Sequence, residues 1–203
     1  MRALFVVIPA LLLAACGSES DDQAQTASGP CAELASILDA RDERTPFRSL
    51  RGAPVLQNDE PVPDAWQMST SFDENVECTV NVMRAFMGGE TDVFTLSCPL
   101  YEASGALEKE RREQDARMIF DLMRSNLDAC LVPDWRAKEI TENPDFEIYH
   151  RLVYEPTQNE NESFAFKLDP IYLELTYTPF IRERTGASGW QVKLQFQKQA
   201  PSR

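Results

Sequence analysis

Few residues of this 203-residue chain have the chemistry of a catalyst, because it contains a single histidine, His150, and only five cysteines. A catalytic histidine needs a nucleophile or a second base within reach. No G-x-S-x-G or comparable nucleophile motif accompanies His150. Its apolar neighbours in 146–154 alternate in phase with it, which is typical of a histidine packed in a sheet. We therefore predict no catalytic histidine.

Metal and cofactor motifs are also missing from the sequence. It contains no H-x-x-x-H pair and no EF-hand loop. Gly88-Gly89 lacks the flanking residues of a phosphate-binding loop. We predict no metal site and no cofactor.

Paired carboxylates are the remaining catalytic chemistry, and the chain has 33 Asp and Glu residues. Catalytic carboxylate pairs share no local spacing in sequence. The alternative to a non-enzymatic function is thus a carboxylate-dependent hydrolase acting in the cell envelope. It requires two carboxylates within about 10 Å of each other in a pocket. At least one of them must also be desolvated.

The charge balance limits the partners that the protein can bind. With 20 Lys and Arg against 33 acidic residues, the formal net charge is −13 and the pI is near 4.5. A field of that sign repels nucleic acid, so we predict no nucleic-acid partner. It favours a basic protein partner, although high negative charge also simply keeps a protein soluble.

The amino-terminal segment carries the most specific motif. Met1-Arg2 is followed by an uncharged, mostly apolar run from Ala3 to Ala15. This run is too short to span a bilayer and is typical of a secretory signal. It ends in Leu13-Ala14-Ala15-Cys16, which resembles the lipobox of bacterial lipoproteins. The resemblance implies cleavage between Ala15 and Cys16, and acylation of Cys16 with diacylglycerol and an amide-linked chain such as palmitate.

The same resemblance implies a location and an organisation for the chain. Gly17 stands where an inner-membrane-retained lipoprotein of enteric bacteria has aspartate, which implies the outer membrane, with the protein facing the periplasm. Residues 1–15 are the expected signal peptide and 16–30, which have no large apolar side chain, a flexible tether. Residues 31–203 are expected to form a single globular domain. Loss of Arg2 with the signal takes the net charge to −13 − 1 = −14.

The other four cysteines, even in number in an exported chain, indicate two disulfides with three possible connectivities. A hairpin centred on Gly88 between the strand-like runs 76–86 and 91–101 places Cys78 opposite Cys98. A helix over 104–130 would be about 40 Å long and would carry Cys130 far from Cys98. We therefore prefer the pairs Cys78–Cys98 and Cys31–Cys130. No C-x-x-C occurs, so we do not expect a redox pair.

Hydrophobic periodicity predicts an α+β domain. Its expected form is one antiparallel sheet of about five to six strands, with two helices on one face and two disulfides. The predicted strands are 76–86, 91–101, 146–154, 164–168 continuing past a bulge or bend at Asp169-Pro170 as 171–177, and 190–196, with 66–72 as a possible sixth. Residues 45–64, which hold four prolines, are predicted to be irregular surface chain.

Two helices are predicted. One starts after Pro30 and aligns Cys31 with Leu34, Ala35 and Leu38. The other has Ser104 as its N-cap and an apolar stripe through Met118, Ile119, Leu122, Met123, Leu127 and Cys130.

Basic residues cluster in one place in the sequence, the series Arg41, Arg44, Arg48 and Arg51. For this series we predict a solvated face with nearby acidic partners. The arrangement Phe47-x-x-Leu50-x-Gly52, the Cys78 and Cys98 hairpin and Cys130-Leu131 resembles exported bacterial proteins without a named family. That resemblance implies a fold with two bridges and no function.

The sequence as a whole favours a membrane-anchored envelope lipoprotein with a non-enzymatic binding or structural domain. The expected partners are the membrane, through the lipid anchor, and a basic protein or another envelope component.

Overall fold

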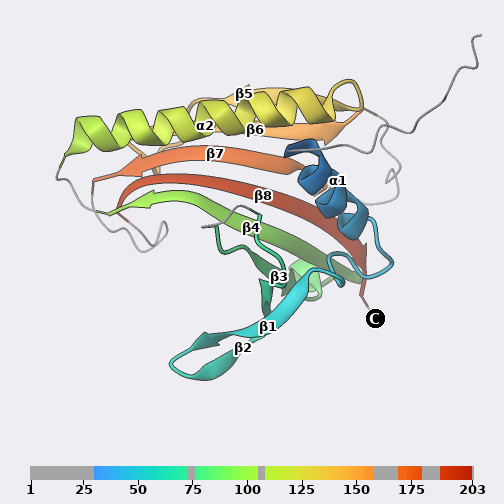
Figure 1. Ribbon diagram of the computed structural model, residues 1–203. Helices are drawn as coiled ribbons and strands as arrows, with labels where there is room; N and C mark the ends of the chain where they lie inside the picture. Colours follow the sequence, from blue (N-terminus) through green and yellow to red (C-terminus); the bar gives the residue numbers. More distant parts are fainter. Residues whose placement is uncertain (1–29, 73–75, 105–107, 158–168, 180–187, 203) are drawn as a thin grey trace, which may run out of the picture.

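A computed structural model describes residues 30–72, 76–104, 108–157, 169–179 and 188–202 (Figure 1). It contains two helices, one short 3-10 turn and one antiparallel sheet. The elements in chain order are α1 Pro30–Arg41, β1 Arg51–Gln57, β2 Glu60–Met68, β3 Thr79–Met83, η1 Phe86–Gly88, β4 Thr91–Ala103, α2 Lys109–Leu131, β5 Trp135–Ile140, β6 Ile148–Pro156, β7 Ile171–Thr178 and β8 Gly189–Pro201.

The sheet has eight strands in the order β1-β2-β3-β4-β8-β7-β6-β5, so the expectation of five to six strands was too low. It consists of two four-stranded meanders, β1–β4 and β5–β8, which are joined where β4 pairs with β8. The α+β class, the antiparallel sheet and the two helices agree with the sequence-based expectation.

The strands of the central sheet alternate between a face that packs against the helices and an open polar face. On β8 the side chains of Trp190, Val192, Leu194 and Phe196 are fully buried. Gln191, Lys193, Gln195 and Gln197 between them are only partly buried. This period of two is what a strand with one buried face requires. The helix α2 packs on β4, β7 and β8, and α1 packs on α2 and β8.

Two disulfides are present in the described chain, and their pairing is the one preferred from the sequence. Cys31 of α1 is joined to Cys130 near the end of α2, with the two Cα atoms 5.4 Å apart. Cys78, just before β3, is joined to Cys98 of β4. The predicted register of that hairpin is also present, because Val80 faces Leu96 and Val82 faces Phe94.

The helices differ in phase from the prediction. Helix α2 begins at Lys109 instead of at Ser104, which is not helical. Its buried residues are Ala116, Phe120, Leu127 and Leu131. Of the predicted stripe, Leu127 is buried and Ile119, Met123 and Cys130 pack against the core, whereas Met118 and Leu122 are exposed. In α1, Leu34, Ile37 and Ala40 are buried and Ala35 is exposed. Within the described residues, no helix is both long and apolar enough to cross a membrane.

Two strands occur where none was predicted, and one predicted strand lies outside the described residues. Residues 45–64, expected to be irregular, contribute β1 and half of β2. The edge strand β5 is mostly exposed and has no alternating apolar pattern to reveal it. The predicted strand 66–72 is the end of β2, which stops at Met68. The predicted strand 164–168 falls outside the described chain.

The basic series is not one solvated face. Arg48 is exposed, but Arg41 is only 3% exposed and lies between α1 and the sheet. Its guanidinium donates hydrogen bonds to the backbone carbonyls of Gln197 and Asp169. Because a buried guanidinium must satisfy its donors, this arginine is part of the core.

Candidate functional site

A two-stranded ribbon, residues 53–64, projects from one end of the sheet (Figure 1). Strand β2 pairs with β3 only through Ala65, Trp66 and Gln67, so the residues before them have β1 as their sole strand neighbour. The ribbon closes at Asn58 and Asp59, which have φ angles of 54° and 66°. Two adjacent positive φ values are what a type I′ hairpin turn requires.

The base of the ribbon is fixed by an aromatic contact. The Arg51 guanidinium lies 4.3 Å from the centre of the Trp66 ring and 5.7 Å from that of Phe94. A cation held over the face of an aromatic ring is attracted by its quadrupole. Because Trp66 is on β2 and Phe94 is on β4, this stack ties the hairpin to the inner part of the sheet.

An ion-pair network fixes the other side of the base. Arg84 donates from Nη2 to Asp64 Oδ1 at 2.7 Å and from Nη1 to Asp92 Oδ2 at 2.7 Å. Asp92 is 2% exposed and also accepts hydrogen bonds from the Ala85 backbone N–H and the Ser202 hydroxyl. Burial disfavours its charge, but the three donors outweigh burial and place the Asp92 pKa below its usual value. The charged network therefore persists at neutral pH.

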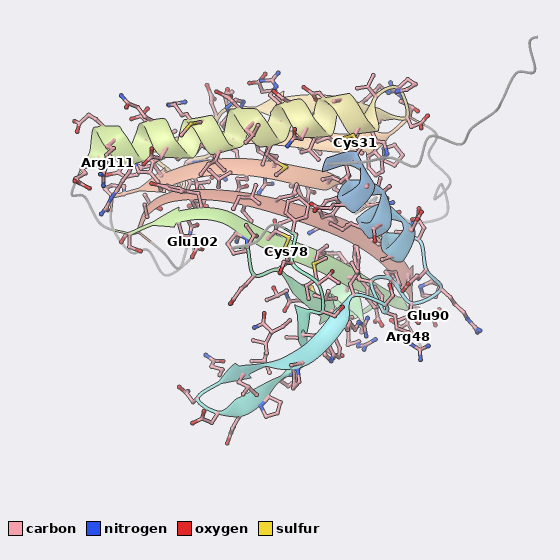
Figure 2. All side chains as sticks on the ribbon, in the orientation of Figure 1. Cys31, Arg48, Cys78, Glu90, Glu102 and Arg111 are labelled. Carbon is pink, nitrogen blue, oxygen red and sulfur yellow. A yellow bond between two sulfur atoms is a disulfide. The ribbon has the colours of Figure 1, made fainter. Side chains whose placement is uncertain are left out.

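The ribbon itself is exposed and carries both apolar and acidic side chains. Leu56 is 57% exposed, and the two strands carry Pro54, Pro61 and Pro63 on the outside. Proline cannot donate to a strand ladder, which protects an open edge against uncontrolled pairing. Figure 2 shows side chains extending from both faces of the ribbon into open space.

Charge is strongly biased around the ribbon. Residues 52–83 contain six acidic residues and no Lys, Arg or His. They are Asp59, Glu60, Asp64, Asp73, Glu74 and Glu77. Of these, Asp64 is paired with Arg84, and the tip residues Asp59 and Glu60 are exposed. Negative charge and an exposed apolar side chain, Leu56, therefore occur together on this projection.

His150 lies on β6, facing the helices. Its Nε2 is 2.5 Å from Glu139 Oε1, with angles that do not fit a hydrogen bond, and its ring centre is 4.6 Å from that of Phe120. Among the described residues, no serine, threonine or cysteine forms a hydrogen bond with its Nε2. This packing is that of a sheet histidine.

Pockets of the described surface offer little acid–base chemistry. An open pocket of about 600 Å³ lies beside Arg84, and its only carboxylate, Asp92, is held ionised by that arginine. A second pocket, of about 520 Å³, contains Glu142 and Glu147, which are both exposed. A general acid of a glycosidase needs a desolvated carboxyl group. In these two pockets, no carboxylate meets that condition together with a neighbouring one.

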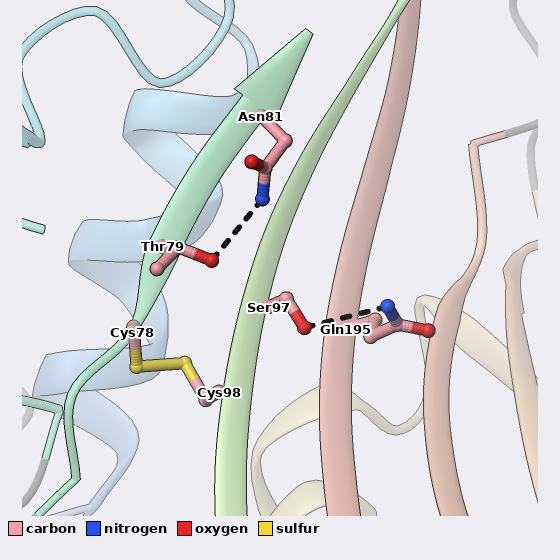
Figure 3. Close-up of a disulfide and its surroundings, with 6 residues drawn as sticks. All are labelled: Cys78, Thr79, Asn81, Ser97, Cys98 and Gln195. Atoms are coloured by element: carbon pink, nitrogen blue, oxygen red, sulfur yellow. Dashed lines mark hydrogen bonds between the residues drawn. A yellow bond between two sulfur atoms is a disulfide. The ribbon is translucent and has the colours of Figure 1, made fainter. Parts of the chain in front are cut away.

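The open face of the sheet carries hydroxyl and amide side chains that bond to each other. Asn81 Nδ2 donates to Thr79 Oγ1 at 3.1 Å, and Gln195 Nε2 donates to Ser97 Oγ at 3.4 Å (Figure 3). Hydrogen-bonded polar pairs of this kind are typical of a solvated sheet face. Among the described residues, no cluster of three or more His, Cys, Asp or Glu side chains could hold a metal ion.

The residues expected to be lipidated or cleaved, Cys16 and Ala15, lie outside the described residues. The ribbon, in contrast, was missed from sequence. Its available signals were the Asn58-Asp59 turn pair and the absence of basic residues from 52 to 83. Comparison of the chain with protein-family models, curated proteins and solved structures finds no match.

Proposed function

We propose that this protein is an envelope lipoprotein, anchored through lipid on Cys16, whose domain binds a basic protein partner through the ribbon 53–64. The lipobox-like Leu13-Ala14-Ala15-Cys16 supports the anchor. Gly17 after Cys16 supports the outer membrane as its location. Two disulfides in one chain suit an oxidising compartment such as the periplasm.

The observation that carries the binding function is the ribbon. It is a fixed projection with an exposed leucine and an acidic tip, and no basic side chain occurs within it. Exposed apolar side chains surrounded by charge are typical of protein interaction sites. The acidic tip would speed encounter with a positively charged partner.

Crosslinking in living cells tests this function. A photo-reactive amino acid placed at Leu56 should give a specific crosslinked product, which mass spectrometry identifies as a basic protein. The same amino acid at Met87, which is 79% exposed on the neighbouring turn, is the matched control. The same products from both positions, or no product from position 56, would contradict binding through the ribbon.

Charge reversal tests whether the acidic tip of the ribbon speeds association with the partner. The double variant Asp59→Lys/Glu60→Lys should slow association with the captured partner by about tenfold at low salt, and less at high salt. Asp121→Lys/Glu110→Lys makes the same change in net charge at two exposed positions of α2 and should leave association unchanged. Equal effects would mean that only net charge matters.

The anchor is tested separately by Cys16→Ser, which should move the protein from the membrane fraction to the soluble periplasmic fraction. Continued membrane association of that variant would refute lipid anchoring at Cys16. Separation of inner and outer membranes from the wild-type strain then tests the proposed location.

A further inference from the structure

The outer side of helix α2 carries an uncharged line of residues that, together with Val132 just past the helix end, is here called the outer stripe: Met118, Leu122, Ser125, Ala129 and Val132. The spacing of four and three residues places the first four on one side of the helix. That side is opposite the buried Phe120 and Leu127. Ten of the 23 residues of α2 are charged, yet none of them is in the stripe.

Apolar side chains of the outer stripe are unusually open to solvent. Met118 is 63% exposed, Leu122 is 62% exposed and Val132, just past the helix end, is 61% exposed. These three are half of the six large hydrophobic residues that are exposed in the described chain. Two of them lie on one side of α2 and the third directly follows its end, and exposed apolar residues concentrated in this way are typical of an interaction surface.

The place where the tether joins the domain identifies what this surface contacts. Helix α1 begins at Pro30, and Cys31 is bonded to Cys130, which lies between Ala129 and Val132 of the stripe. Figure 2 shows Cys31 close to one end of α2 and Arg111 at the other. The chain from the lipobox therefore enters the domain at the carboxy-terminal end of the outer stripe.

The length of the tether sets the distance to the membrane. The expected tether, residues 16–30, is fifteen residues long. If it is flexible, as its composition predicts, a segment of this length has an average reach of about 20 Å. The stripe from Met118 to Val132 is itself about 20 Å long. An acyl anchor on Cys16 thus keeps the whole stripe within reach of the bilayer surface.

We propose that the outer stripe rests on the phospholipid surface, with α2 parallel to the membrane. This inference depends on the proposed lipid anchor. Met118, Leu122 and Val132 enter the boundary between headgroups and acyl chains, while the charged flanks of α2 stay in the headgroup layer. The ribbon lies at the far side of the sheet from α2 (Figure 1), so this orientation directs it away from the membrane toward its partner.

Oxidation of methionine by hydrogen peroxide tests the orientation, with peptide mass spectrometry as the readout. Met118 is 63% exposed, and Met83 and Met87, at 58% and 79%, are internal controls near the opposite end of the sheet. In the soluble Cys16→Ser protein all three should oxidise at similar rates. In the acylated full-length protein reconstituted in phospholipid vesicles, Met118 should oxidise at least about fivefold more slowly, while the controls change little.

A pair of variants separates lipid contact from other causes. Leu122→Glu in the acylated protein should abolish the protection of Met118, because a charge is expelled from the interface, while the protein still sediments with vesicles. Leu56→Glu places the same charge on the ribbon and should keep the protection. Circular dichroism checks that both variants fold.

Other results of the oxidation experiment would overturn either the membrane contact of α2 or the lipid anchor. Sedimentation with vesicles but unprotected Met118, or protection of Met83 instead, overturns this inference alone. Wild-type protein that fails to associate with vesicles overturns the anchor and the proposed location. Concentration-dependent protection of Met118 in soluble Cys16→Ser protein would show that a second copy of the chain covers the stripe, which also overturns contact with lipid.

Discussion

Arg41 and Asp169 are 128 positions apart in the sequence, yet Arg41 Nη2 donates a hydrogen bond to the Asp169 backbone carbonyl at 2.5 Å. Arg41 Nε donates to the Gln197 carbonyl at 3.1 Å. Burial lowers the pKa of the Arg41 guanidinium, and the carboxylates of Asp42 and Asp169 oppose that effect. One side chain therefore fastens α1 to β8 and to the residues that lead into β7.

Replacing this arginine should loosen α1. Arg41→Met removes the hydrogen bonds to two part-buried carbonyls and should lower the free energy of unfolding by about 2 to 3 kcal/mol. Arg41→Lys should recover only part of the loss, because an ammonium cannot reproduce the planar set of donors. Urea unfolding followed by circular dichroism measures both. Arg48→Met, at an exposed neighbour, should change stability by less than about 0.5 kcal/mol.

Acid should weaken the network at the base of the ribbon. The pKa of Asp92 is lower in the folded protein, so its ionisation stabilises the fold above the unfolded-state value near 3.9, and this contribution is lost as the pH falls below it. Asp92→Asn should cost about 1 to 3 kcal/mol at pH 7, and the difference from wild type should shrink toward pH 2.5.

Urea titrations at pH 7, 4 and 2.5 measure this difference. Glu90→Gln, two positions away and exposed, is the control and should follow wild type at every pH. A difference for Asp92→Asn that stays constant with pH would mean that the aspartate acts through packing and not through its charge.

Gly189 is required by the approach of β8 to β4. It has a φ of +106°, and a Cβ added there would lie 2.0 Å from the Ala103 carbonyl oxygen. Gly189→Ala should therefore force the two strands apart and cost about 3 kcal/mol or more. Gly88→Ala is the matched control, because its φ is +75° with open space around it. It should cost about 1 to 2 kcal/mol. Thermal unfolding compares the two.

The two disulfides should differ in their contribution. Cys31–Cys130 spans 99 positions and Cys78–Cys98 spans 20. In the chain-entropy model the longer loop contributes about 1.4 kcal/mol more to the free energy of unfolding. The double serine variants Cys31→Ser/Cys130→Ser and Cys78→Ser/Cys98→Ser allow the comparison by urea unfolding. A larger loss from the second pair would assign the difference to strain or packing and not to loop length.

Sequence patterns were sufficient to predict strand pairing where the turn residues and the alternation of apolar residues agreed. Gly88-Gly89 between alternating strands predicted the pairs Val80–Leu96 and Val82–Phe94, and with them the approach of Cys78 to Cys98. The presence of helix α2 and its end near Cys130 were predicted correctly, but its start and part of its buried side were not. Its buried side is set by Phe120 and by Ala116, and a small alanine contributes little to a hydrophobic pattern.

The ribbon could not be predicted because its prolines argue against a strand. Pro54, Pro61 and Pro63 are tolerated in β1 and β2 only because these strands are exposed and one is at the sheet edge. That property depends on the arrangement of the whole sheet. The outer stripe was hidden for a related reason: Met118 and Leu122 look like core residues until the sheet defines which side of α2 is covered.

The position of β8 between β4 and β7 has a consequence for the order of assembly. Strand β4 is complete at Ala103, but its partner begins only at Gly189, after the whole of β5–β7. Contacts so distant in sequence form slowly, because a long loop must close first. The two meanders consequently cannot join before β8, the last strand in the sequence, is available to pair with β4.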